Sequence, residues 1–140
     1  MITAKEVMEK SIKVYPDDSI EKVRRLFKKN PEVHALIVIN KNGKFLGEVH
    51  ELDVLAPLVP EDLLDEEEVV GALGFGYQKK FFAKKVKAIM RTHQFTTNID
   101  TDIKKIAYLM YKEEIRVVPV LGKTGKVRGI LHIGNIIRSI

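Results

Sequence analysis

Two short stretches of the sequence carry polar residues of the same types in the same register. GEVHELDVL, from Gly47 to Leu55, contains a glycine, a histidine and an aspartate at intervals of three residues. GILHIGNII, from Gly129 to Ile137, repeats this spacing with asparagine in place of aspartate. A carboxylate can accept charge-assisted hydrogen bonds from two hydroxyl groups, whereas an amide offers one acceptor oxygen and a donor. Both residue types are also favoured at helix starts, so Asp53 and Asn135 are candidates for ligand binding or for helix capping.

The histidines give little support to catalysis. The chain contains four of them: His34, His50, His93 and His132. Their spacing does not match a metal-ligand pattern such as His-x-x-x-His, and no serine, aspartate and histidine lie in a recognisable nucleophile context. His50 and His132 are related by the repeat, so they could face each other and bind a metal ion, but duplication alone explains the pair. We therefore expect a protein that is not an enzyme and has no metal centre.

A basic and aromatic segment suggests a different function. Its basic residues are Lys79, Lys80, Lys84, Lys85, Lys87 and Arg91, and its aromatic residues are Tyr77, Phe81 and Phe82. This combination suits the backbone and the stacked bases of a single-stranded nucleic acid. A solvated helix whose aromatic side chains join the core or a dimer interface explains the same composition. Nucleic-acid binding through Lys79 to Arg91 is therefore an alternative function.

Composition limits the class of protein. The chain has 140 residues, 45% of them hydrophobic, which is enough for one compact domain or for two small halves that share a core. No apolar run approaches the roughly 18 residues that span a bilayer, and the N-terminus has no apolar signal segment. Cysteine is absent from the sequence. We expect a soluble cytoplasmic protein that has no disulfides and does not bind membranes, and the net charge of +5 favours anionic partners.

The repeat extends over most of the chain, with an offset of 82 residues between equivalent glycines and histidines. Each copy, of about 55 residues, is too small to bury its own apolar faces well, so we expect two halves that pack on one another. We divide the chain into a first repeat at 1–58, a linker at 59–82 and a second repeat at 83–140. The linker exceeds an ordinary loop and is expected to be partly helical, over Glu61–Val70.

Each copy predicts the same order of elements, β-α-β-β-α. A short extended piece leads into an acidic turn that can cap the first helix, whose apolar residues recur at helical spacing. The next segments, ALIVI and VVPV, are short and rich in branched residues, which is typical of buried strands. Turns that contain glycine then connect each of them to a return strand. The predicted strands of the first copy are 12–14, 35–39 and FLGEV, and its closing helix is 51–58. In the second copy the predicted strands are 95–97, 117–120 and VRGIL, and the closing helix is 133–140.

This organisation resembles the tandem cystathionine-β-synthase (CBS) domain pair, often called a Bateman module. The motifs that carry the resemblance are VM and IM near the starts of the copies, PDDSI and DTDI before the first helices, VVPV in the second copy, and a glycine followed six residues later by Asp or Asn. Their order recurs in both copies and covers nearly all of the chain. The resemblance implies an α/β (α+β) fold in which two β-α-β-β-α repeats pack about a pseudo-two-fold axis, and it implies a homodimer.

The resemblance also implies a ligand. CBS pairs often bind adenosine-containing molecules such as AMP, ADP, ATP or S-adenosylmethionine in the cleft between the two copies. In the family pattern, the residue at the Asp53 position accepts hydrogen bonds from the ribose, and a small hydroxyl residue three positions earlier helps to place it. This chain departs from the pattern because histidine replaces the hydroxyl residue in both copies. The implied ribose-binding set is Gly47, His50 and Asp53 in the first copy and Gly129, His132 and Asn135 in the second, with Asp53 the stronger acceptor.

Further contacts follow from the same resemblance. His34 and Arg116 stand where the family contacts phosphate, and Arg116 is preferred because its guanidinium is permanently charged and forked. A solvated loop charge is the alternative explanation for both residues. Thr96 matches a hydroxyl residue that the family uses before its first helix. The residues expected near the base are Ala35, Val117 and Pro119, which could equally be plain core residues.

The sequence therefore predicts a non-catalytic sensor that binds an adenine nucleotide and acts on an unknown regulated protein. No cofactor is required; the nucleotide is a regulatory ligand that stabilises one conformation of the module. Two alternatives stay open. One is a ligand-free scaffold for dimerisation or partner docking, and the other is the nucleic-acid-binding protein described above.

Overall fold

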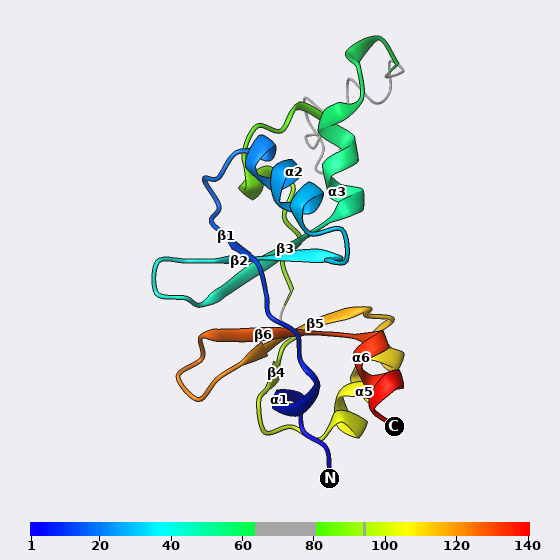
Figure 1. Ribbon diagram of the computed structural model, residues 1–140. Coiled ribbons are helices and arrows are strands. Elements are labelled where there is room, and N and C mark those ends of the chain that lie inside the picture. Colours follow the sequence, from blue (N-terminus) through cyan, green and yellow to red (C-terminus); the bar gives the residue numbers. More distant parts are fainter. Residues whose placement is uncertain (64–80, 94) are drawn as a thin grey trace. The chain divides into compact units, whose positions relative to one another are not determined.

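Two three-stranded sheets form the framework of the protein (Figure 1). The computed structural model describes residues 1–63, 81–93 and 95–140. The first sheet has the order β1 (Lys13–Val14), β2 (Ala35–Ile39) and β3 (Phe45–His50), and the second has the order β4 (Thr97–Asn98), β5 (Val117–Leu121) and β6 (Val127–His132). In each sheet the short first strand pairs parallel with the second strand, and β5 and β6 form an antiparallel hairpin.

The helices complete the predicted β-α-β-β-α order in both repeats. The first repeat contains α2 (Ile20–Lys29) and α3 (Glu51–Leu55), and the second contains α5 (Ile103–Glu113) and α6 (Ile133–Ser139). Shorter elements are α1 (Ala4–Val7) and the 3₁₀ turns η1 (Ala56–Leu58), η2 (Glu61–Leu63) and η4 (Val86–Ala88). The predicted α+β class and the order of the elements are therefore confirmed.

The closing helix of the first repeat is shorter than predicted. We expected one helix over residues 51–58, but α3 ends at Leu55 and continues as the 3₁₀ turn η1. Pro57 lies in this turn, and proline has no N–H to continue the α-helical ladder. In the linker, the helix predicted over Glu61–Val70 begins as the 3₁₀ turn η2, and its remaining residues, 64–70, lie outside the described part of the chain.

Local sequence signals explain where the long helices begin. The Oγ of Ser19 accepts a hydrogen bond from the N–H of Lys22 at 3.1 Å, and the carboxylate of Asp102 accepts one from the N–H of Lys104 at 2.9 Å. Each side chain satisfies one backbone donor at the start of a helix, as the acidic turns predicted. In the first copy the cap is the serine that follows the acidic residues of the turn.

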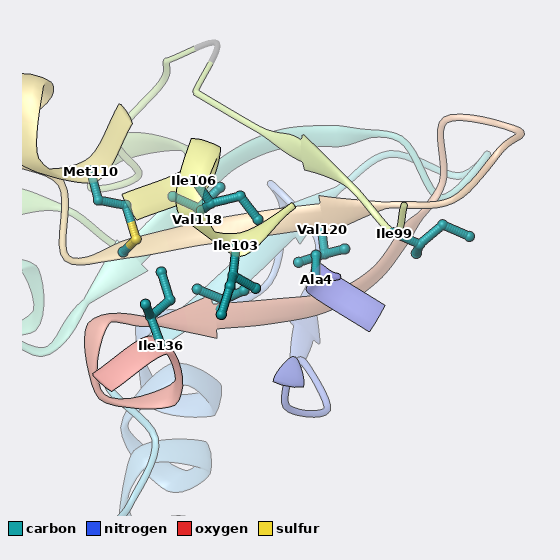
Figure 2. Packing of buried hydrophobic residues seen from close by; sticks show 9 residues of the cluster. Ala4, Ile99, Ile103, Ile106, Met110, Val118, Val120 and Ile136 are labelled. Atoms are coloured by element: carbon teal, nitrogen blue, oxygen red, sulfur yellow. The ribbon is translucent and has the colours of Figure 1, made fainter. Parts of the chain in front are cut away.

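The second repeat packs around a well-defined core (Figure 2). Figure 2 shows Ile103, Ile106 and Met110 on successive turns of α5, close to Val118 and Val120 of β5. The spacing of the helical residues matches the apolar stripe expected from the sequence. The full set of buried residues is Ala4, Ile99, Ile103, Ile106, Met110, Val118, Val120, Leu131 and Ile136. Ala4 comes from the N-terminal segment, so this segment contributes to the core of the second repeat.

The chain forms two compact units that do not follow the order of the repeats. One unit contains residues 1–12, 39–46 and 93–140, and the other contains residues 13–38 and 47–92. Residues 1–12, which begin the predicted first repeat, therefore lie with most of the second repeat, and residues 83–92, which begin the predicted second repeat, lie with most of the first. We name residues 1–12 and 83–92 the lead segments. The division at residues 58 and 83 stays a prediction.

Candidate functional site

The candidate site of the first repeat lies where β3 leads into α3. Glu48 of β3 and Arg91 of a lead segment exchange two backbone hydrogen bonds, from Glu48 N to Arg91 O at 2.9 Å and from Arg91 N to Glu48 O at 2.8 Å. A Cβ atom on Gly47 would lie 2.5 Å from the carbonyl oxygen of Arg91. Glycine is therefore needed at this position because the lead segment approaches the strand so closely.

Asp53 is buried at the start of α3, and its carboxylate accepts hydrogen bonds from His50 and Arg91. It is the third residue of the helix and is 3% exposed. Its Oδ2 accepts a hydrogen bond from the N–H of His50 at 2.9 Å, which completes a capping box at the start of the helix. The Nε of Arg91 donates to both carboxylate oxygens, at 3.0 and 2.9 Å. The predicted capping role is therefore confirmed, and the carboxylate is also one half of an ion pair.

A buried carboxylate lies next to this ion pair. Glu48, in β3, is only 4% exposed although its side chain is acidic. Its Oε1 lies 2.9 Å from Nε2 of His50, the residue that precedes α3. Glu48, His50, Asp53 and Arg91 thus form one polar cluster: the imidazole of His50 meets Glu48, the guanidinium of Arg91 meets Asp53, and the backbone N–H of His50 links the two pairs. We call these four residues the first polar cluster.

The second repeat reproduces the geometry with different charges. Glu9 exchanges backbone hydrogen bonds with Ile130 at 2.8 and 2.9 Å, and a Cβ atom on Gly129 would lie 2.7 Å from the carbonyl oxygen of Glu9. Oδ1 of Asn135 accepts from the N–H of His132 at 2.7 Å. Nδ2 of Asn135 donates to Oε1 of Glu9 at 2.8 Å. In the second repeat the neutral amide of Asn135 therefore faces the carboxylate of Glu9, whereas in the first repeat the carboxylate of Asp53 faces the guanidinium of Arg91.

The other predicted site residues lie in the strands or immediately before them. His34 and Arg116 are exposed immediately before β2 and β5, and Thr96 is partly buried before β4. The carbonyl oxygen of Arg116 accepts a hydrogen bond from the N–H of Ile133 at 3.1 Å, which places Arg116 beside the start of α6. The residues predicted near the base, Ala35, Val117 and Pro119, are buried in strands. Their ligand-binding roles stay predictions.

The structure divides the predicted residues between the two units. His34, Ala35, Gly47, His50 and Asp53 belong to one unit. The remaining predicted residues belong to the other unit: Thr96, Arg116, Val117, Pro119, Gly129, His132 and Asn135. Within residues 1–63, 81–93 and 95–140, no group of three or more His, Asp or Glu side chains is placed to hold a metal ion.

Sequence reasoning missed three residues that complete the polar clusters. Arg91 was assigned to the basic segment, and Glu9 was not considered. Glu48 carried a usable signal, because an acidic residue among apolar strand residues needs a partner when it is buried. The partners of Asp53 and Asn135 lie 38 and 126 residues away along the chain, so no local pattern indicates them.

Much of the described basic segment is engaged within the protein. Nζ of Lys85 and of Lys87 lie 3.6 and 3.2 Å from Oδ1 of Asp17. The hydrogen bond from Lys87, together with the charges of Lys87 and Lys85, lowers the pKa of Asp17 from its ordinary value of 3.8. Val86 and Ile89 of the same segment are fully buried. Lys79, Lys80 and Tyr77 lie outside the described residues.

No helix in the described part of the chain has both the length and the apolar character needed to cross a membrane.

The duplicated β-α-β-β-α repeat, with a glycine and a capping Asp or Asn at each closing helix, defines the class of fold. Residues 4–59 and 86–140 match the CBS domain family, and the chain belongs to this family. The uncharacterized protein MJ1426 of Methanocaldococcus jannaschii is 30% identical over an alignment of 156 residues, and this alignment covers 97% of this chain and 89% of that protein.

Two solved structures share the fold over nearly the whole chain. CBSX2 of Arabidopsis thaliana, crystallised in complex with AMP, is 24% identical, with a TM-score of 0.81 and with 99% of this chain and 96% of that chain covered. The CBS domain pair of protein MJ0100, crystallised with 5′-methylthioadenosine and S-adenosyl-L-methionine, is 22% identical, with a TM-score of 0.75 and with 99% and 95% covered.

Proposed function

We propose that this protein is a non-catalytic regulatory module that binds an adenosine-containing ligand: AMP, ADP, ATP or S-adenosylmethionine. The observation that carries the proposal is the duplicated arrangement of Gly, His and Asp or Asn at the starts of α3 and α6. It lies in a fold that matches, over 99% of this chain, a protein crystallised with AMP. A matching fold supports a function only together with a site of suitable chemistry.

The predicted site residues carry the chemical groups that such a ligand needs. Asp53 and Asn135 carry acceptor oxygens for ribose hydroxyls. The exposed His34 and Arg116 precede the buried strands β2 and β5, where they can meet an anionic tail. Ala35, Val117 and Pro119, which are buried in β2 and β5, are the residues that the proposal places beside the base.

The module acts by shifting a conformational equilibrium. A ligand that binds one conformation more tightly than another raises its population, and a partner protein recognises that conformation. A homodimer and an unidentified regulated protein in the cytoplasm complete the proposal.

Thermal melting with each ligand tests the proposed function. A ligand at about 100 times its dissociation constant adds roughly 2.7 kcal/mol to the free energy of unfolding. For 140 residues this corresponds to a rise in melting temperature of about 9 °C. AMP, ADP, ATP and S-adenosylmethionine are compared with GMP, which carries the same ribose and phosphate as AMP but a different base.

A rise with an adenine ligand and a smaller rise with GMP supports the proposal. No rise with any of the four adenosine-containing ligands, confirmed by calorimetry at millimolar ligand, refutes it and leaves the ligand-free scaffold. Native mass spectrometry of the purified protein measures the assembly state and detects any retained nucleotide.

A further inference from the structure

The ion pair between Arg91 and Asp53 covers the carboxylate that the proposed function assigns to the ribose. The side chain of Asp53 is only 2% exposed, whereas that of Arg91 is 42% exposed. Arg91 uses its single Nε–H for Asp53, and none of its four other N–H groups donates to a described residue. The guanidinium thus neutralises a buried anion on one side and offers donors to solvent on the other.

A ribose that binds Asp53 competes with the Nε–H of Arg91, which donates to both carboxylate oxygens. The hydroxyl groups satisfy the carboxylate, but they leave the guanidinium without the counter-charge that it had. A phosphate on the same ligand restores that counter-charge, because guanidinium and phosphate form strong forked hydrogen bonds. Adenosine carries no anion, and S-adenosylmethionine carries a sulfonium centre next to its ribose.

We propose that Arg91 is a specificity-determining residue, which transfers from Asp53 to the ligand phosphate and thereby selects phosphorylated adenine nucleotides over adenosine. This inference rests on the proposed function. It concerns the first polar cluster only, because the equivalent of Arg91 in the second repeat is Glu9, which bonds to the neutral Asn135 and would repel a phosphate.

Calorimetric titration with AMP and adenosine tests the inference in the full chain. The ratio of the adenosine to the AMP dissociation constant is expected to be large in the wild type. Arg91→Ala should lower this ratio by about tenfold to hundredfold, the effect of one or two charge-assisted hydrogen bonds. The decrease should combine weaker AMP binding with tighter adenosine binding, since Asp53 becomes accessible.

Three further variants separate specificity from other effects. Arg25→Ala removes the same charge from an exposed position of α2 and should leave the ratio unchanged. Arg91→Gln keeps N–H donors near Asp53 without the charge, and it serves if Arg91→Ala melts below the assay temperature. In Asp53→Asn protein, Arg91→Ala should no longer tighten adenosine binding.

The outcomes distinguish this inference from the proposed function. Equal ratios in the wild type and in both Arg91 variants overturn the role of Arg91 while nucleotide binding stands. A lower ratio in Arg25→Ala as well also overturns it, because net charge then explains the effect. Absence of binding to every ligand in the wild type and in all variants refutes the proposed function itself. Adenosine binding that appears only in Arg91→Ala supports the inference.

Discussion

Breaking the ion pair between Arg91 and Asp53 should destabilise the protein measurably. Arg91→Ala leaves the Asp53 carboxylate buried, with the N–H of His50 still donating to it. Asp53→Asn removes the charge but keeps an oxygen that can accept from His50. The two single variants and the double variant form a thermodynamic cycle that isolates the interaction between the two side chains.

The magnitude follows from the unequal burial of the two partners. Exposed ion pairs contribute about 0.2–1 kcal/mol, and removing one partner of a fully buried pair costs about 3–5 kcal/mol. Here the carboxylate is 2% exposed and the arginine 42%, so solvent screens one side of the interaction. We expect a loss of about 1–3 kcal/mol for Arg91→Ala, which for 140 residues lowers the melting temperature by roughly 3–10 °C.

Urea unfolding followed by circular dichroism measures each variant, and an unchanged denaturant slope shows that the unfolding transition is comparable. The matched control is the pair of Lys22, on α2, and Asp18, which precedes this helix, at 3.1 Å. Its lysine side chain is also 42% exposed, but its carboxylate is 20% exposed. The same cycle with Lys22→Ala and Asp18→Asn should give a coupling energy of about 0.3–0.5 kcal/mol.

A coupling energy for Arg91 and Asp53 that is no larger than the control refutes the reasoning. It would mean that the guanidinium stabilises this carboxylate no more than an exposed lysine stabilises its partner. The burial of Asp53 would then be supported by the helix start alone.

Three other changes test single features. Gly47→Ala should cost about 1–3 kcal/mol in urea unfolding, because its Cβ would lie 2.5 Å from the carbonyl oxygen of Arg91; an unchanged midpoint would contradict the close approach. Glu114→Gly should stabilise the protein by up to about 1 kcal/mol, because Glu114 ends α5 with a left-handed φ of 54°, and a lower melting temperature would count against this. The lowered pKa of Asp17 means that its bond to Lys87 stabilises the fold above the ordinary pKa of 3.8 and is lost as the pH falls through the lowered value. The stability difference between wild type and Asp17→Asn should therefore shrink below pH 3.8, and a difference that grows there would contradict the assignment.

Most of the fold follows from local patterns. The run ALIVI predicts β2, and all five of its residues are buried. The spacing of Ile103, Ile106, Leu109 and Met110 predicts the inward face of α5; Ile103, Ile106 and Met110 join the core, and Leu109 is partly buried. The end of α3 is the main local error, and Pro57 explains it because a proline cannot donate the next helical hydrogen bond.

The position of the lead segments could not be predicted, since it depends on contacts between distant residues. Residues 1–12 share a unit with most of the second repeat and residues 83–92 with most of the first, although each segment begins the other repeat along the chain. Local propensity gives no information about which repeat a lead segment packs against. Gly47 and Gly129 indicate only that another backbone segment approaches each strand closely, and the structure shows that these segments contribute the carbonyl oxygens of Arg91 and Glu9.

The position of the lead segments also explains why one repeat has aspartate where the other has asparagine. From sequence, Asp53 looked like the better ribose acceptor of the two. In the structure, each residue matches the side chain of the lead segment that it meets: the carboxylate of Asp53 meets Arg91, and the amide of Asn135 meets Glu9. An aspartate at position 135 would face the carboxylate of Glu9 at hydrogen-bond distance, where two like charges repel.

The same charges disfavour the opposite arrangement of the lead segments. If each lead segment lay with its own repeat, Glu9 would meet Asp53, and Arg91 would meet Asn135. One pair would then be repulsive, and the other would leave a guanidinium beside a neutral amide. The side chains that close the two helix starts therefore favour the observed pairing of lead segments and repeats, through one ion pair and one hydrogen bond to a charged group.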